Sequence, residues 1–174
     1  DLLFGIMGFG RPPAEFDEGR AGHLRDAFGP SLRQLADALS LPLDDVEAHG
    51  ELALATKDLE IAAGSIEAGT VAGMRTVVVG MREGRELIRF RANWYCSTDL
   101  DADWALQPTG WRVQVEGDTP LDVTLRFPVS PEQMAETTPG YTAHRAVNAV
   151  AAVCDAAPGI RTTADLPQLV ARLG

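Results

Sequence analysis

The sequence predicts an α+β fold: a mixed, mostly antiparallel sheet of four to six strands, with helices packed on one face. Apolar and polar residues alternate with a period of two in four stretches, which is the pattern of half-buried strands. These stretches are 77–81, 86–95, 111–116 and 121–127. Apolar residues recur at helical spacing over 24–39 and 143–154, which predicts one helix before the strands in the sequence and one after them. Strands and helices do not alternate along the chain, which excludes a complete doubly wound sheet.

The helices have recognisable starts and stops. The first is predicted to begin at Asp17, and Gly29-Pro30 predicts a kink or two abutting helices, because proline lacks a backbone donor and clashes with the preceding turn. The last long helix is predicted to begin near Gly140 and to stop at Pro158-Gly159. Thr163 is placed to cap a short terminal helix.

The remaining segments predict a further strand and several turns. Residues 46–55 read as a strand, and residues 82–84 as a hairpin turn with a glycine where a positive φ is convenient. Residues 56–70 leave a strand and a turn both open. Residues 97–109 contain Asp, Pro and Gly and predict a loop.

Residues 1–16 predict a flexible lead-in to a single domain over 17–174, a length typical of one domain. Gly5, Gly8 and Gly10 invite comparison with a dinucleotide-binding fingerprint, but their spacing is reversed. No apolar strand precedes them, and prolines follow where a phosphate-binding helix would begin. The sequence therefore predicts no cofactor-binding residues and no dinucleotide site within this chain.

The charge of the chain limits its partners. The 174 residues carry a formal net charge of −10, with no basic block to offset it, so nucleic acid and anionic membranes are unfavourable partners. The sequence contains no run of 18 or more apolar residues, which is the length needed to cross a membrane. Cys96 and Cys154 lack zinc-site spacing, so no metal is expected, and two buried free thiols in a reducing cytoplasm are the favoured interpretation.

Two polar groups are candidate substrate-binding sites. His144 precedes Asn148 by one helical turn, so the two share a face and suit either a ligand or a neighbouring backbone or subunit, whereas His23 and His49 stand apart from them. The second group is Gly69 with Thr70, where a ring of exposed backbone N–H groups and one hydroxyl suits a substrate carboxylate. A turn that lets two backbones approach closely explains this glycine equally well.

Arginines recur along the strand predicted at 86–95. Arg89 and Arg91 share a face with Asn93, and Arg112 and Arg126 are candidates to join them. Arginine pairs bidentately with carboxylates, on a substrate or on a second subunit. A solvated face neutralised by neighbouring acids is the alternative. An antiparallel sheet with one open face favours subunit packing, so we expect a homo-oligomer.

Four stretches together resemble one family. They are GTVAGMRTVVVGM at 69–81, ELIRFRANWY at 86–95, GWRVQVEGDTPLDVTLRF at 110–127 and AHRAVNAVAAVCDAAPGIRTTADLP at 143–167. This sequence resembles the C-terminal domain of dihydrodipicolinate reductase-like proteins, in the 2,4-diaminopentanoate dehydrogenase branch. The resemblance implies a two-domain enzyme in which a separate N-terminal domain binds NAD(P)H. It also implies that the present domain closes over a small substrate, an amino-acid-like amine or imine, and builds the oligomer.

The resemblance also assigns residues. Reductases of the dihydrodipicolinate branch carry a His-His pair, a lysine and a Gly-Thr that holds a carboxylate. Lys57, Gly69 and Thr70 occur here in that order, so the resemblance implies a catalytic role for Lys57 and substrate binding for Gly69 and Thr70. Ala55-Thr56 replaces the His-His pair, which puts the dihydrodipicolinate reaction itself in doubt. The chain begins without Met, so we expect a piece of a longer protein whose other half binds the cofactor. A stand-alone, non-catalytic binding or oligomerisation module is the alternative.

Overall fold

The structure is a computed structural model that describes residues 2–16, 20–106 and 110–167. The chain divides into two compact units, Asp1–Leu106 and Gln107–Gly174, called unit 1 and unit 2 below. Each unit is described by itself. The prediction of a single domain over 17–174 stays a prediction.

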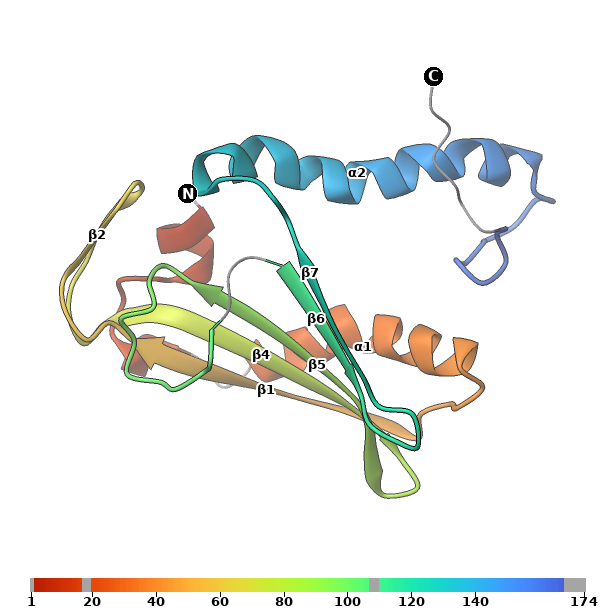
Figure 1. The fold of residues 1–174 in the computed structure, drawn as a ribbon, viewed down its shortest axis with the longest axis horizontal. Coiled ribbons are helices and arrows are strands. Elements are labelled where there is room, and N and C mark those ends of the chain that lie inside the picture. The colour runs from red at the N-terminus through yellow and green to blue at the C-terminus, as the bar shows by residue number, and fades with distance from the viewer. Residues whose placement is uncertain (1, 17–19, 107–109, 168–174) are drawn as a thin grey trace. The chain divides into compact units, whose positions relative to one another are not determined.

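The main sheet of unit 1 has three antiparallel strands in the order β1-β4-β5 (Figure 1). Their bounds are β1 Asp45–Leu54, β4 Val71–Arg82 and β5 Arg85–Tyr95. The central strand β4 is almost entirely buried and pairs with a neighbouring strand along each of its edges. A tight turn joins β4 to β5, with φ of 53° at Glu83 and 71° at Gly84, as the glycine predicts.

Helix α1, Arg20–Ala38, covers one face of this sheet. Its buried residues Leu32 and Ala36 pack with Val46 and Val78 of the strands. Gly29 lets the helix approach, since a Cβ there would lie 3.3 Å from Cγ1 of Val46. Of the two predicted alternatives, two abutting helices are wrong, because a single helix continues through Pro30. The kink stays a prediction. The predicted start at Asp17 lies outside the described residues.

The N-terminal segment is packed, so the prediction of a flexible lead-in is wrong. It contains a π-helix η1, Leu2–Met7, and a short 3-10 helix η2, Pro13–Glu15. Phe9 is 2% exposed, and the N–H of Gly10 donates to the carbonyl of Val71 at 2.8 Å. Gly8 and Gly10 have φ of 75° and 77°, so these glycines turn the chain rather than hold a phosphate.

A small hairpin settles the open assignment of residues 56–70. Strands β2, Leu59–Ile61, and β3, Gly64–Ile66, pair with each other as a two-stranded sheet. Leu59 and Ile66 are buried in a cluster with Phe9, Val71 and other apolar residues. The base of this hairpin joins the end of β1 to the start of β4.

Unit 2 consists of the hairpin β6, Gly110–Val115, with β7, Leu121–Arg126, followed by the long helix α2, Pro131–Asp155. The ring of Phe127 stacks on Tyr141 of α2 at a centroid distance of 4.5 Å. The helix starts nine residues before the predicted Gly140, because Ser130 and Gln133 form a capping box that satisfies the first N–H groups.

After α2, the described residues form a turn in which Asp165 accepts hydrogen bonds from the N–H and hydroxyl of Thr162 at 2.8 and 2.7 Å. No helix begins at Thr163 within this described part. The predicted class is confirmed: the protein is α+β with antiparallel strands and a helix packed on a sheet face. The described strands are distributed among sheets of three, two and two strands, where the sequence predicted one sheet of four to six.

Candidate functional site

A polar cluster, called the Lys57 cluster below, lies where β1 ends and β4 begins. It contains the predicted residues Lys57, Gly69 and Thr70, which backbone hydrogen bonds bring together. The N–H of Ala55 donates to the carbonyl of Thr70 at 2.9 Å, and the N–H of Gly69 donates to the carbonyl of Ala55 at 2.8 Å. Gly69-Thr70 is thus anchored two residues before Lys57.

The ammonium of Lys57 pairs with Asp99, with Nζ 2.9 Å from Oδ2. Backbone hydrogen bonds to Thr56 and Ser97 hold Asp99 in place. Its carbonyl accepts from the N–H and the hydroxyl of Thr56, each at 3.0 Å, and its N–H donates to Oγ of Ser97 at 3.1 Å. Lys57, by hydrogen bonding and by its charge, lowers the pKa of the Asp99 carboxyl below its ordinary value. Because both side chains are exposed, this ion pair contributes little to the stability of the fold. Its effect is to orient the charged end of Lys57.

The Gly69-Thr70 step does not form the predicted ring of exposed N–H groups. The N–H of Gly69 is engaged by Ala55, and the N–H of Thr70 donates to the carbonyl of Glu67 at 3.2 Å. The Thr70 hydroxyl donates to the same carbonyl at 2.7 Å. Gly69 has φ of 79°, which explains the glycine as a turn residue. The N–H groups therefore cannot serve a carboxylate in this arrangement.

The hydrogen-bonding capacity that remains in the cluster is of two kinds. Lys57 spends one ion pair on Asp99 and keeps donors for a second anion. Thr70 has used its hydroxyl proton, so its oxygen can still accept a hydrogen bond. Asp99 is a carboxylate beside the lysine and can also accept. A cation for a carboxylate, Lys57, and an acceptor for an amine, Asp99, therefore lie side by side.

His144 and Asn148 belong to α2 of unit 2, whereas the Lys57 cluster belongs to unit 1. The two side chains are exposed and one turn apart, as predicted. The ring of His144 lies over Gly140, where a Cβ would be 3.5 Å from its Cε1. Their role in substrate binding stays a prediction. The side chain of His23 lies outside the described residues.

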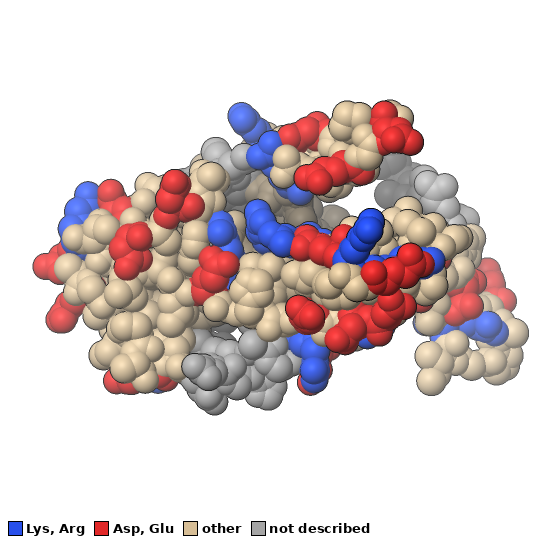
Figure 2. Space-filling model, turned by 90° about the horizontal axis from the view of Figure 1, so that it is seen from below, with Lys and Arg blue, Asp and Glu red and all other residues tan. Residues whose placement is uncertain are grey.

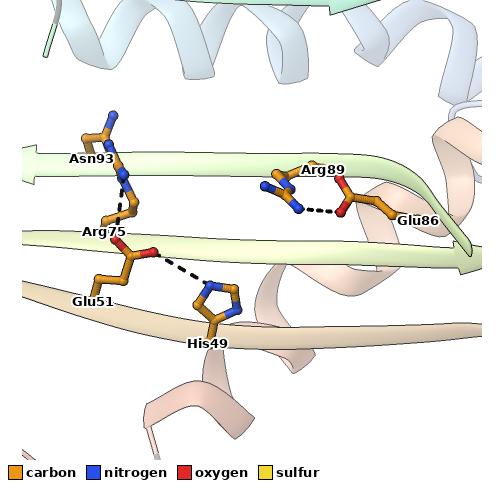
Figure 3. A network of polar contacts seen from close by, with 6 residues as sticks. All are labelled: His49, Glu51, Arg75, Glu86, Arg89 and Asn93. Carbon is orange, nitrogen blue, oxygen red and sulfur yellow. Dashed lines mark hydrogen bonds and ion pairs between the residues drawn. The ribbon is translucent and has the colours of Figure 1, made fainter. Parts of the chain in front are cut away.

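The sequence missed the centre of a polar network on the face of the main sheet opposite α1 (Figure 3). Arg75 of β4 stands directly between Glu51 of β1 and Asn93 of β5. Its Nε donates to Oδ1 of Asn93 at 2.8 Å, and it also donates to the carbonyl of Trp104 at 2.9 Å, with its guanidinium 4.6 Å from that ring's centroid. The sequence did offer one sign of this network: Arg75 lies two residues before Val77, so a single arginine shares the strand face of the valines.

This face carries opposite charges on its two edges. On the β1 edge lie Glu47 and Glu51, with Nε2 of His49 3.7 Å from Oε1 of Glu51. On the β5 edge lie Arg89, which pairs with Glu86, and Arg91. Asn93 shares this face, as predicted. We define this surface as the open sheet face.

Arg112 and Arg126 do not join that face, because their strands form a separate two-stranded sheet in unit 2. Arg112 instead pairs with Asp122 across its own hairpin. Cys96 is half-buried and burial raises its thiol pKa, but Cys154 is exposed, which corrects the prediction of two buried thiols.

Basic and acidic side chains are interspersed over the face seen in Figure 2, with no continuous basic patch there. Within the described residues, no group of three metal-ligating side chains gathers. None of the helices that the structure describes combines the length and the apolar character needed to cross a bilayer.

Two relatives resemble this chain. An amine dehydrogenase from Streptomyces virginiae is 28% identical over 154 residues, covering 84% of this chain and 43% of that protein. A solved amine dehydrogenase from Mycobacterium smegmatis matches 99% of this chain and 48% of its own, with a TM-score of 0.68 and 24% identity. The second likeness shows the fold alone. The chain spans less than half the length of these relatives.

A family model agrees with the resemblance seen in the sequence. The model is described as the 2,4-diaminopentanoate dehydrogenase C-terminal domain, and it matches residues 6–174. That match takes in both units, from the packed N-terminal segment to the end of the chain. The chain therefore belongs to the family of 2,4-diaminopentanoate dehydrogenase C-terminal domains.

Proposed function

We propose that this chain is the substrate-side domain of an NAD(P)H-dependent oxidoreductase that acts on an amino-acid-like amine or imine. The family match and the likeness to the Streptomyces virginiae amine dehydrogenase support this proposal. The nicotinamide cofactor would be held by a separate part of the protein, since the glycines at 8 and 10 serve as packed turns in unit 1. The cofactor supplies the hydride; this chain orients the substrate.

One observation carries the proposal: in the Lys57 cluster a cation, Lys57, lies 2.9 Å from a hydrogen-bond acceptor, the carboxylate of Asp99. An amino-acid-like substrate has the matching pair, a carboxylate and a nitrogen that carries protons. Lys57 would hold the carboxylate, and the oxygens of Thr70 and Asp99 would accept from the amine.

His144 and Asn148 remain proposed substrate contacts from α2. They are exposed polar side chains on one helix face, which suits hydrogen bonds to a polar ligand. We also propose a cytoplasmic location, which two unpaired cysteines favour, and a homo-oligomer that forms through the open sheet face.

The test compares two substrates in the full-length protein. Lys57→Met should raise KM for an amino-acid substrate about tenfold, the loss of one modest ion pair, with kcat little changed. The same variant should leave KM unchanged for the matching amine that lacks the carboxylate. Glu60→Gln, an exposed change on the neighbouring hairpin, is the control and should alter neither constant.

Two outcomes would count against the proposal. Equal effects of Lys57→Met on both substrates would show that the lysine does not read the carboxylate. Full-length protein that turns over no amine or imine with either nicotinamide cofactor would favour the non-catalytic module instead.

A further inference from the structure

The loop at 97–104 carries Asp99 into the Lys57 cluster and is attached to the main sheet at two points. The first point is an antiparallel backbone bridge between Leu100 and Ala55, the residue that follows β1. The second point is on β4, where Trp104 contacts the open sheet face. The position of Asp99 therefore depends on how this loop is held.

Gly73 of β4 gives the loop room to lie against the strand. A Cβ there would lie 2.9 Å from Cδ1 of Leu100 and 3.2 Å from Cζ3 of Trp104. Both distances are shorter than an ordinary van der Waals contact, so a side chain at this position would displace the loop. Gly73 and Arg75 are two residues apart in β4, so they lie on the same face of the sheet.

Arg75 fixes the loop beside this glycine. Its Nε donates to Asn93 of β5 at 2.8 Å, and its Nη1 lies 3.6 Å from Oε2 of Glu51 of β1. The guanidinium is a rigid planar fork, so these two partners aim Nη2 at the carbonyl of Trp104, to which it donates at 2.9 Å. The side chain of Arg75 is only 13% exposed, and its guanidinium carbon lies 4.6 Å from the centroid of the Trp104 ring.

The relative strength of these contacts decides what holds Asp99. A hydrogen bond from a charged, largely buried donor contributes more than an ion pair between exposed side chains. Lys57 and Asp99 are both exposed, so their ion pair does not fix the loop by itself. Arg75 and the bridge at Leu100 fix the loop, and the ion pair forms where the loop places Asp99.

We propose that Arg75 is a positioning residue for the candidate site: it anchors the 97–104 loop at Trp104 and thereby places Asp99 beside Lys57. This inference rests on the proposed function for the role of that site and adds a residue that acts on it through the loop. Lys57 and Ser97 are the groups that lower the pKa of the Asp99 carboxyl. A change at Arg75 should therefore alter this pKa by moving the loop.

Arg75→Lys tests the anchor in the full-length protein, because it keeps the positive charge and removes the planar fork. In a carboxyl-carbon NMR titration, the pKa of Asp99 should rise towards 3.8, since the released loop carries Asp99 away from Lys57. Arg82→Lys is the matched control: Arg82 also donates to a backbone carbonyl, that of Pro42 at 3.1 Å, but at the other end of β4. It should leave the pKa of Asp99 unchanged.

A double variant shows whether the effect passes through the ion pair. Once Lys57→Met has removed the lysine, Arg75→Lys should change the pKa of Asp99 no further. In the wild-type background, Arg75→Lys should also raise KM for an amino-acid substrate about threefold with kcat little changed, and it should add nothing to Lys57→Met. A merely structural role of Arg75 would instead lower the amount of active enzyme, and so kcat, in both backgrounds.

Gly73→Ala disturbs the same loop with no change of charge. Its methyl group would meet Leu100 and Trp104, so the pKa of Asp99 should again rise towards 3.8. This variant decides the question if Arg75→Lys does not fold.

The outcomes are distinct. An Asp99 pKa that is unchanged in folded Arg75→Lys, or in Gly73→Ala where the lysine variant does not fold, would overturn the positioning role. An equal rise in Arg82→Lys, or a further rise in the Lys57→Met background, would assign the effect to the sheet as a whole and would also overturn it. The titration needs no substrate, so its result is independent of the KM comparison that tests the proposed function.

Discussion

Thr76 lies in the middle of β4 with no exposed surface, and its hydroxyl has no hydrogen-bond partner in the part of the chain that the structure describes. Its register neighbours are Gly50 and Ala92, which offer no polar side chain. A buried hydroxyl without a partner costs free energy, whereas a methyl group of the same shape does not.

Thr76→Val should therefore raise the free energy of unfolding by about 1 kcal/mol, measured by urea denaturation. Thr76→Ser is the matched control: it keeps the unpaired hydroxyl, loses the methyl group, and should lower stability by about 1 kcal/mol. A loss of more than about 1 kcal/mol in Thr76→Val would reveal a partner for the hydroxyl, such as a buried water.

Asp99 offers a second prediction at the residue scale, because Lys57 holds the pKa of its carboxyl below the ordinary value of 3.8. A group with a depressed folded pKa contributes stability above its unfolded pKa and loses it as pH falls through the folded value. The Lys57–Asp99 pair should therefore persist at neutral pH and dissolve only in acid, below the ordinary value.

The measurement is a carboxyl-carbon NMR titration of Asp99. Lys57→Met should move the pKa of Asp99 up towards 3.8, whereas Arg11→Met, which removes a cation elsewhere in unit 1, should not. An Asp99 pKa that is identical in the wild type and in Lys57→Met would show that the ion pair does not form in solution.

The candidate site shows what residues alone can predict. Lys57, Gly69 and Thr70 were recognised from their order, and backbone pairing does bring them together at Ala55. The direction of each N–H could not be predicted, because it depends on how the β2–β3 hairpin closes. Glu67 and Ala55 take the donors that the sequence assigned to a ligand. Arg75 was missed because its partners come from three separate segments.

At the scale of elements, the β6–β7 hairpin depends on two glycines with positive φ but different surroundings. Gly110 has φ of 155°, and a Cβ there would lie 2.1 Å from the carbonyl oxygen of Leu125. Gly117 has φ of 148°, and a Cβ there would meet nothing within 4 Å. The two positions thus share a backbone conformation that favours glycine, but only one is crowded.

Gly110→Ala should disrupt the end of the hairpin, because the carbonyl oxygen of Leu125 cannot move aside without breaking the pairing of β6 with β7. Amide hydrogen exchange should accelerate along β6 and β7 in this variant, by more than tenfold beyond the increase in Gly117→Ala. If both variants exchange alike, strain from positive φ explains the glycines and the close contact at Gly110 is absent in solution.

Strands were easier to predict than helix ends and connections. The alternating stretches coincide with β4, β5, β6 and β7. Their burial was not predicted: β4 is buried along most of its length, whereas no residue of β6 or β7 is buried. Helix α2 begins earlier than predicted because the Ser130 cap outweighs the interruption at Pro139. The N-terminal segment looked flexible because Gly8 and Gly10 suggested a loop, but Phe9 between them is buried by contacts distant in sequence.

At the scale of the whole molecule, we propose a division of labour in which this chain binds the substrate and another part of the protein binds the cofactor. The described residues of unit 1 include the Lys57 cluster, which we propose as the substrate site. The relatives that the chain matches are more than twice as long as their shared region, and the family model places this region at the C-terminal side. Hydride chemistry on this account needs a dinucleotide held by another part of the protein.

Isothermal titration calorimetry with NADPH and NADH tests that claim most directly. The full-length protein should bind at least one of the two cofactors, and the 174-residue chain, folded as judged by circular dichroism, should bind neither up to millimolar concentration. Micromolar binding of either dinucleotide by the isolated chain would contradict the division of labour.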